Sequence, residues 1–209
     1  MTNTQPNNDF MTFLQPYLQE ETPLIGENFE AISLDHAELD RLDARQCTFS
    51  GCAFAACSLE GVSFTDVTFS HCDFSNSICI DSYFERCCFQ NCRCIGTNFG
   101  GSIWKHTKAA DSTFQYAIFD RGRMTEPDFS GCDFEEASLA ECRLKHFTAK
   151  DCRFVRSSFF KTPLAGIDFS SGEFLSPVVS APPAELKGIT VNLTQAAGLA
   201  GLLGIHVKF

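Results

Sequence analysis

Cysteine and histidine are the residues of this sequence that could bind a metal ion or act as nucleophiles. The chain of 209 residues contains twelve Cys and five His. Cys47, Cys52 and Cys57 are five residues apart, whereas paired cysteines in zinc sites are usually separated by roughly two to four residues. A thiol in a small enclosed space packs as an apolar side chain. The spacing therefore indicates packing, and we predict no metal and no cofactor.

The sequence also lacks the short motifs that build common catalytic sites. It contains no GxSxG nucleophile motif, no GxxxxGK[ST] phosphate-binding loop, no HExxH zinc motif and no GxGxxG dinucleotide fingerprint. Four of the five histidines lie between the apolar positions of the pattern described next, where we expect solvated side chains. We therefore predict that the protein is not an enzyme. These histidines are His36, His71, His106 and His146.

A bulky apolar residue recurs at every fifth position, which we call a centre. From Phe29 to Phe174 there are thirty such positions, of which seventeen are Phe and none is charged or polar. In an α-helix a step of five turns through ~500°, so the centres would spiral over the whole surface. In a flat strand an odd step alternates between the two faces. A short extended side followed by a corner, repeated, keeps every centre on one axis and predicts a solenoid. The predicted core centres include Phe49, Phe54, Phe64, Phe69, Phe74, Trp104, Phe114 and Phe134.

A second, smaller residue lies two positions before each centre, in what we call the small slot. Nine cysteines occupy small slots, Cys79 and Cys94 are themselves centres, and Cys88 should point outward. Stacked thiols could come within disulfide range of each other, but a reducing cytosol argues against oxidation. The nine cysteines are Cys47, Cys52, Cys57, Cys72, Cys87, Cys92, Cys132, Cys142 and Cys152.

This pattern resembles the pentapeptide-repeat family over residues 27–176. The resemblance implies an all-β fold, a right-handed quadrilateral β-helix with four five-residue units per turn. Five of the eight positions in one column, whose members are twenty residues apart, are Cys, and this favours the same arrangement. With strands ~4.8 Å apart, about 7.5 turns would form a rod of ~36 Å. The recurring cysteines are Cys52, Cys72, Cys92, Cys132 and Cys152.

The charge of the chain limits its partners. The formal net charge is −10, whereas a nucleic-acid-binding domain is normally basic, so we predict no direct contact with nucleic acid. When the repeats are sorted into four columns, those centred on 29, 34 and 39 carry net charges of −4, −3 and −3, and the column centred on 44 carries +2. The predicted rod therefore has three acidic sides and one mildly basic side.

The C-terminal segment breaks the period of five. After the Pro-containing stretch SPVVSAPPAE, the pattern predicts a short strand around Ile189 and Val191, a helix capped by Asn192 or Thr194, and alternating residues from Ile205 onward. Gly204 suits the helix end. An apolar module at the end of a solenoid should cap the core, pair with another chain, or both. We predict dimerisation through Ile189, Val191, Leu199, Leu202, Leu203, Ile205 and Val207.

The form of this tail adds a functional resemblance. Leu-Lys-Gly-Ile-x-Val at 186–191, followed by Gln195-Ala196, Leu199 and Gly204-Ile205, is similar to the topoisomerase-protecting group that includes Qnr, MfpA and AlbG. The resemblance implies a homodimer that engages DNA gyrase or topoisomerase IV and protects it from quinolones or related inhibitors. An acidic rod would do so by imitating duplex DNA, although DNA carries one charge per ~1.7 Å of axis and this rod only one per ~4.5 Å. The acidic residues that we expect to contact the enzyme are Asp73, Asp81, Asp111, Asp120, Asp133, Glu135, Glu136 and Glu141.

A second function stays open on the sequence alone. The protein could be a structural or interaction scaffold, or an immunity factor against a peptide toxin, without contact to a topoisomerase. Acidity would then serve only to keep the rod soluble and its ends unpaired. A gyrase supercoiling assay with and without quinolone distinguishes the two.

The repeat is weakest between residues 102 and 128. Trp104 and Ala109 are consecutive centres of very different size, and Gly122 and Pro127 occupy small slots. Proline removes a hydrogen-bond donor, and alanine leaves space unfilled. We therefore predict a bulge or kink in this region and a contact site for a partner.

The N-terminal segment has the pattern of an amphipathic helix. Phe10, Phe13, Leu14, Tyr17 and Leu18 form one helical stripe, interrupted by Pro16. We interpret it as a cap that covers the first turn, with a partner-binding helix as the alternative.

The pattern divides the chain into three parts. Residues 1–26 form the predicted cap, 27–176 the β-helix, and 177–209 a linker with the dimerisation module. The sequence contains neither a signal-peptide pattern nor an apolar run of membrane-spanning length, so we expect a cytoplasmic protein without a membrane contact.

Overall fold

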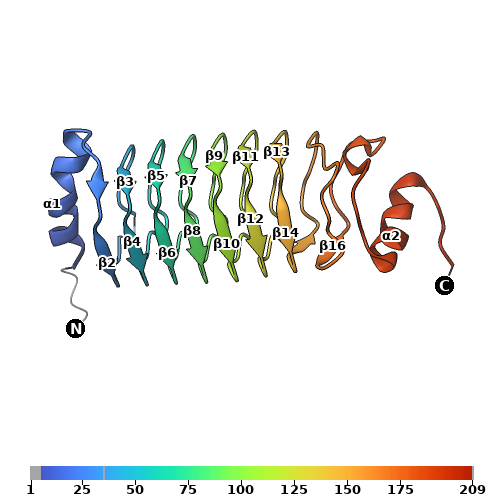
Figure 1. Cartoon of the computed structure of the whole chain (residues 1–209), viewed down its shortest axis with the longest axis horizontal. Coiled ribbons are helices and arrows are strands. Elements are labelled where there is room, and N and C mark those ends of the chain that lie inside the picture. Colours follow the sequence, from blue (N-terminus) through green and yellow to red (C-terminus); the bar gives the residue numbers. More distant parts are fainter. Residues whose placement is uncertain (1–5, 35, 209) are drawn as a thin grey trace.

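The computed structural model describes residues 6–34 and 36–208. The chain forms a straight rod of stacked turns, with a helix at each end (Figure 1). Two seven-stranded parallel sheets run along the rod, and a two-stranded sheet lies near its C-terminal end. The first sheet contains β1 (Leu24–Ile25), β3 (Asp43–Arg45), β5 (Ser63–Thr65), β7 (Tyr83–Glu85), β9 (Ile103–Lys105), β11 (Arg123–Thr125) and β13 (Arg143–Lys145). The second contains β2 (Asn28–Glu30), β4 (Thr48–Ser50), β6 (Thr68–Ser70), β8 (Cys88–Gln90), β10 (Lys108–Ala110), β12 (Asp128–Ser130) and β14 (Thr148–Lys150). The third pairs β15 (Arg153–Val155) with β16 (Glu173–Leu175).

Paired residues of neighbouring strands are twenty positions apart in the sequence. Phe49 faces Phe69, and isolated bridges such as Ala53 with Asp73 and Ser58 with Ile78 continue the same register on the other two sides. Twenty residues per turn and five per side give the predicted right-handed quadrilateral β-helix. We number its faces by their centres, which recur every twenty residues: face 1 from Leu24 to Leu164, face 2 from Phe29 to Phe169, face 3 from Leu34 to Phe174, and face 4 from Leu39 to Phe159.

The centres fill one continuous core, as predicted. Phe49 and Phe69 stack with ring centroids 5.4 Å apart, and Phe114 and Phe134 stack at 5.0 Å. Rings on adjacent faces meet edge-on, for example Phe69 and Phe74 at 5.1 Å. Stacked and edge-on aromatic pairs contribute beyond their buried area, by roughly 0.5–1.5 kcal/mol each. All eight predicted core centres are buried: Phe49, Phe54, Phe64, Phe69, Phe74, Trp104, Phe114 and Phe134.

The small slots point into the same core, as predicted. The Ser77 hydroxyl donates to Phe54 O at 3.0 Å and the Thr97 hydroxyl to Phe74 O at 2.7 Å, so their polar atoms are satisfied. All twelve cysteines are free thiols, and Cys88 is the one that is partly exposed. Burial raises the pKa of Cys87 to about 12. This thiol therefore stays protonated at neutral pH and packs as a small side chain.

The corners of the rod hold an unusual backbone conformation. The residue two positions after each centre generally has a positive φ, for example His71 (55°), Asp81 (54°) and Tyr116 (59°). Only glycine, and to a lesser degree Asn and Asp, adopts this left-handed region easily. The corner positions cannot be recognised in the sequence by glycine or asparagine alone. Hydrogen bonds between neighbouring turns hold even Arg and Tyr in the left-handed conformation, as when Tyr116 N–H donates to Glu135 O at 3.0 Å.

The region from 102 to 128 is regular, so the predicted bulge and kink are wrong. Strands β9 to β12 keep the twenty-residue register without a break. The indole of Trp104 is fully buried and stacks on Phe89, with centroids 5.4 Å apart. It also approaches Phe129 at 6.4 Å. Because Phe89 and Phe129 lie directly before and after Ala109 on face 2, the large indole fills the space that alanine leaves.

Pro127 causes no distortion because its position needs no donor. The equivalent residues of neighbouring turns, Thr107 and Phe147, donate no backbone hydrogen bond to another described residue. The carbonyl of Pro127 accepts from Thr148 N–H at 3.1 Å, as the ladder requires. Proline therefore removes only an N–H group that the fold does not use.

The N-terminal helix α1 (Pro6–Gln19) covers the first turn. Phe10 and Leu14 are buried, and the Phe10 ring lies edge-on against Phe29 with centroids 4.9 Å apart. Pro16 lies inside the helix, as the sequence indicated. The observed packing is that of the predicted cap, whose residues 1–5 lie outside the described residues.

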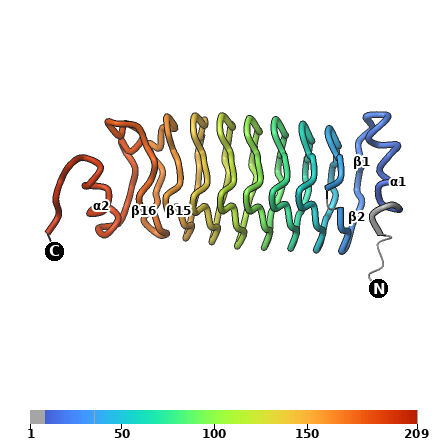
Figure 2. The backbone as a smooth tube through the Cα atoms, turned by 180° about the vertical axis from the view of Figure 1, so that it is seen from behind, coloured from blue at the N-terminus to red at the C-terminus, as the bar shows by residue number. Residues whose placement is uncertain are grey.

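The C-terminal module contains the predicted helix. Helix α2 (Leu193–Ala200) begins after Asn192, whose side chain accepts from Gln195 N–H while the Gln195 side chain accepts from Asn192 N–H. The turns η1 (Ala184–Leu186) and η2 (Gly201–Leu203) flank it, and Gly204 ends it with a φ of 72°. Figure 2 shows α2 at the opposite end of the rod from α1. The two predicted strands of this module differ in outcome: Thr190 forms one bridge with Asp168, whereas residues 205–208 form no strand and are exposed.

A buried carboxylate joins this module to the last turns. Glu185 is 5% exposed and accepts from Lys161 N–H at 2.7 Å and from Ser180 N–H at 3.2 Å. Burial acts to raise the pKa of Glu185, but hydrogen bonds from the Ser180 side chain and from backbone amides outweigh it and hold the pKa below its ordinary value. The ionised side chain therefore stabilises the fold.

Glu185→Gln is expected to destabilise the protein at neutral pH but not in acid. Since the folded pKa is depressed, the stabilisation is present above the unfolded pKa of about 4.3 and is lost as the pH falls through the folded value. Loss of charge-assisted hydrogen bonds should lower the free energy of unfolding by ~2 kcal/mol at neutral pH. Urea unfolding at neutral and acidic pH measures this, with the exposed Glu60→Gln as the control. An equal effect of Glu185→Gln at both pH values would contradict it.

Candidate acidic binding faces

The eight predicted acidic residues lie on three faces rather than one. Asp111 is on face 2. Asp81, Asp120 and Glu141 are on face 4. Face 3 carries the other four: Asp73, Asp133, Glu135 and Glu136.

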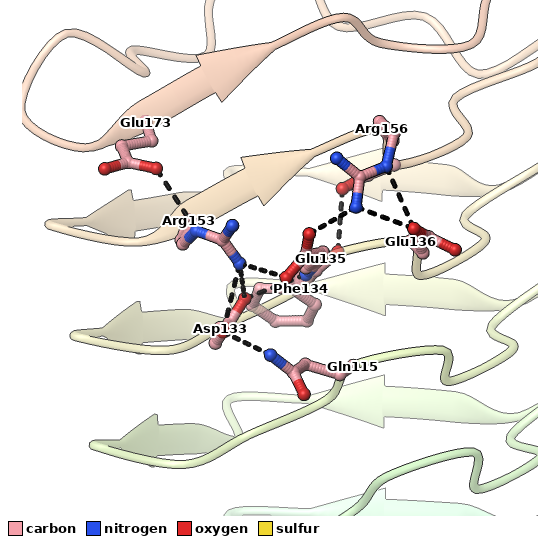
Figure 3. Close-up of polar contacts among 9 residues, drawn as sticks. Gln115, Asp133, Phe134, Glu135, Glu136, Arg153, Arg156 and Glu173 are labelled. Carbon is pink, nitrogen blue, oxygen red and sulfur yellow. Dashed lines mark hydrogen bonds and ion pairs between the residues drawn. The ribbon is translucent and has the colours of Figure 1, made fainter.

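The acids of face 3 form an ion-pair network rather than a free anionic surface (Figure 3). Arg153 contacts Asp133 at 3.3 Å, Glu135 at 2.5 Å and Glu173 at 3.2 Å. Arg156 binds both Glu136, at 2.7 Å, and Glu135. Its guanidinium lies one turn beyond these carboxylates, so the register of the solenoid places the charges together. The hydrogen bond from Arg153 holds the pKa of Glu135 below its ordinary value, and Glu135 remains ionised.

Two further candidates are paired in the same way. Asp73 lies 3.5 Å from Arg93, and its other oxygen accepts from Ser75 N–H at 2.8 Å. Glu141 lies 3.1 Å from Lys161. Five of the eight candidates thus have a cationic partner on the next turn, and the count of formal charges overstates the field that they present to a partner.

Asp81 and Asp120 come together at one hollow on face 4. They line a depression of about 370 Å³, together with Gly100 and Gly101, which have no side chains to fill it. Asp120 accepts from the Ser138 hydroxyl at 2.5 Å and from Ala140 N–H at 3.1 Å, which fixes its orientation. Asp81, Asp111 and Asp120 have no ion pair with any residue that the structure describes. These three are the candidates without an ion-pair partner, although Arg121 also lines the hollow.

Face 1 has a different charge pattern along its length. Its acids are paired: Asp43 with Arg45, Asp66 and Glu85 with Arg86, and Glu126 with His106. Three cations further along face 1 have no acidic partner within the described chain. Counting charges by column predicted a mildly basic face, but not that the basicity is concentrated toward its C-terminal end. These cations are Arg123, Arg143 and Lys145.

The residues proposed for dimerisation surround an apolar groove beside α2. The groove has a volume of about 410 Å³, and five of the seven residues line it. Leu202 and Val207 lie outside it and are 42% and 43% exposed. A large part of the C-terminal surface is therefore apolar and uncovered. The five lining residues are Ile189, Val191, Leu199, Leu203 and Ile205.

The described part of the chain contains neither a candidate metal-binding cluster nor a helix that could cross a membrane. No group of three or more His, Cys, Asp or Glu side chains among residues 6–34 and 36–208 is arranged to hold a metal ion. Neither described α-helix has the length and apolarity needed to cross a bilayer.

Comparison with known proteins places this geometry in a fold family. A family model described as pentapeptide repeats matches residues 34–78. The fold is a pentapeptide-repeat β-helix.

Among solved structures, a trypsin-treated variant of QnrB1, a plasmid-mediated fluoroquinolone resistance protein, matches with a TM-score of 0.70 at 20% identity, covering 90% of this chain and 100% of that chain. HetL from the cyanobacterium Nostoc, a pentapeptide-repeat protein involved in heterocyst differentiation regulation, matches with a TM-score of 0.33 at 14% identity, covering 86% of this chain and 95% of that chain. A search of curated protein sequences found no match. The likeness to QnrB1 concerns the fold alone.

Proposed function

We propose that this protein is a noncatalytic binding protein that imitates DNA, binds DNA gyrase or topoisomerase IV in the cytoplasm, and protects the enzyme from quinolones or related inhibitors. The observation that carries the proposal is the straight rod with acidic outer faces, on which Asp81, Asp111 and Asp120 present carboxylates without ion-pair partners. The fold shared with QnrB1, itself described as a fluoroquinolone resistance protein, supports it.

The mechanism follows from shape and charge. A surface that holds duplex DNA is positively charged and shaped for a narrow rod. Because five of the eight candidate acids are paired with Arg or Lys, long-range attraction is weaker than for DNA. Short-range contacts at the hollow of Asp81 and Asp120 should therefore determine affinity. Bound there, the rod would compete with DNA or destabilise the drug-trapped complex.

We also propose that the protein is a homodimer that joins through its C-terminal modules. The uncovered apolar groove beside α2 and the exposed Leu202 and Leu203 support this proposal. Burial of exposed apolar surface is the main favourable contribution to such an association. Two rods joined at this end would double the length available to an enzyme partner.

Neutralising the unpaired acids is expected to abolish protection. The variant Asp81→Asn/Asp111→Asn/Asp120→Asn removes three negative charges, while each asparagine keeps an acceptor oxygen. We expect the quinolone concentration that halves gyrase supercoiling in the presence of the protein to fall at least tenfold, toward its value without the protein. A matched control, Asp9→Asn/Glu20→Gln/Glu21→Gln, removes three charges from the N-terminal cap and should protect as the parent does.

Two outcomes would refute the proposal. Full protection by the triple variant would exclude a role for these acids. Absence of protection by the parent protein would favour the alternative of an interaction scaffold or toxin-immunity protein. Circular dichroism of each variant shows whether the fold is retained.

A further inference from the structure

The hydrogen-bond ladder is interrupted on two adjacent faces of the rod, faces 1 and 2. The first sheet ends at β13 and the second at β14, although one more turn of the solenoid follows. On faces 3 and 4 the pairing continues, through β15 with β16 and through the bridge of Ser158 with Val178. On faces 1 and 2, no backbone hydrogen bond among the described residues joins 163–171 to β13 or β14. Leu164, Gly166 and Phe169 donate in the ordinary direction, to the carbonyls of Glu185, Gly188 and Thr190 in the following segment. We call this interruption between 142–150 and 163–171 the ladder gap.

Pro163 provides a physical cause for the gap. In earlier turns the residue before each face 1 centre donates to a carbonyl of the preceding turn, as Arg123 does to Ser102 O at 2.9 Å and Arg143 to Gly122 O at 3.0 Å. The next residue in this series is Pro163, which has no N–H group. The carbonyl of Cys142, which would receive that bond, accepts no hydrogen bond from the described chain.

The edge of β13 therefore carries unused backbone groups. The N–H group of each centre and the N–H group two positions later point toward the following turn. Phe54 N–H, at a centre, donates to Asp73 O, and Glu126 N–H, two positions after a centre, donates to Lys145 O. The corresponding N–H groups of Leu144 and His146 have no hydrogen-bond partner among the described residues. An open strand edge with free donors and acceptors can accept an additional strand.

The gap also opens toward the core. A groove of about 350 Å³ is lined by outward residues such as Arg123 and Lys145 and by inward residues such as Cys142 and Leu144. Leu144 is the one centre between Leu34 and Phe174 that is not fully buried. The edge thus has an apolar floor with room for a side chain.

The charged side chains that line the groove beside β13 are all cations. Arg123, Arg143 and Lys145 on face 1 and Lys150 on face 2 form no ion pair with a described acid. Asp168 is the one acid that lines the neighbouring groove of about 450 Å³ on face 2. A rod with net charge −10 therefore concentrates free cations where its backbone edge is open.

We propose that the edge of β13 binds an extended acidic segment of a partner protein by adding a strand to the first sheet. Side chains alternate along a strand, so carboxylates of the segment would lie opposite Arg143 and Lys145, and an aliphatic residue between them would enter the groove against Leu144. Leu144 N–H and His146 N–H would donate to carbonyls of the segment. A nucleic acid fits less well, because its sugar-phosphate backbone cannot complete a β-ladder and does not use an apolar floor. This site is independent of the proposed topoisomerase and dimer contacts.

The test uses the full-length protein and a fluorescent peptide, Gly-Thr-Glu-Ile-Glu-Thr-Gly. Fluorescence anisotropy should show binding that weakens at least tenfold in Arg143→Glu/Lys145→Glu, and at least tenfold when lysines replace the two glutamates of the peptide. The matched control Arg41→Glu/Arg121→Glu makes the same change in charge on face 4 and should bind as the parent does. Hydrogen exchange of the Leu144 and His146 amides should be fast in the free protein and at least tenfold slower with peptide.

Several results would overturn the proposal. Slow exchange of both amides in the free protein would show that the edge is closed. Absence of peptide binding at low salt, or binding that leaves these amides in fast exchange, would exclude strand addition. A single-stranded oligonucleotide that binds through Arg143 and Lys145, while the peptide does not, would identify the cations as a phosphate site instead.

Discussion

Trp104→Ala is expected to lower the free energy of unfolding by ~3–5 kcal/mol, the usual cost of removing a large aromatic side chain from a core. The indole is fully buried, and its centroid lies 4.8 Å from that of Phe84 and 5.2 Å from that of Phe99. Its Nε1–H donates to the Ser102 hydroxyl at 2.9 Å. The neighbouring centre is Ala109, and its small side chain cannot fill the cavity that the indole would leave. Urea unfolding followed by circular dichroism measures the loss.

The same reasoning predicts a rescue. Ala109→Phe alone should overpack the core and destabilise it by ~1–3 kcal/mol. In the double variant Trp104→Ala/Ala109→Phe, the new ring can occupy the space that the indole leaves, so the combined loss should be smaller than the sum of the single losses. Additive losses would contradict the volume exchange between these two centres. Tyr116→Ala, at a side chain that is 52% exposed, serves as the control and should have little effect.

Leu202→Asp/Leu203→Asp is expected to convert the proposed dimer into a monomer and to weaken self-association at least a hundredfold. Leu203 is 65% exposed in the single chain, and both residues lie in η2 at the end of the rod. Association would bury these apolar side chains, and a charge in that interface would lose its hydration. The stacked turns do not depend on them, so the variant should remain folded. Sedimentation velocity over a range of protein concentrations measures the association.

A matched change elsewhere tests whether the effect is local. Ile25→Asp/Ile78→Asp also replaces two exposed aliphatic residues, at 54% and 44% exposure, far from α2. This control should associate as the parent does. If the parent chain sediments as a monomer at micromolar concentration, the dimer proposal fails. If the control dissociates as well, the contact is not confined to the C-terminal module.

The period of five residues predicted most of the fold. The spacing identified the centres, the small slots and the four faces, because side-chain volume directed at one axis can be recognised in the sequence alone. The N-terminal cap and the Asn192-capped helix were also predictable, since amphipathic stripes and caps depend on neighbouring residues. The corner conformation was missed because residues as different as Arg121 and Tyr116 adopt it.

The candidate site was less predictable. Column charges gave the acidic and basic faces, but the network of Arg153 and Arg156 with Glu135 depends on side chains eighteen to twenty-one residues apart. Only the stacked turns bring these atoms into contact. The sequence therefore could not separate paired acids from the unpaired Asp81, Asp111 and Asp120.

Pro127 and Pro163 show which features of this protein follow from its sequence and which depend on its tertiary structure. The sequence determined the rod, because repeated large and small residues have only one common axis on which to pack. The sequence also indicated that proline removes a hydrogen-bond donor, and for this reason we predicted a distortion at Pro127. Only the assembled ladder shows that the position of Pro127 uses no donor, whereas Pro163 stands where a donor is required. The reason is geometric: whether an N–H group points along a corner or toward the adjacent turn is set by the stacking of residues twenty positions apart.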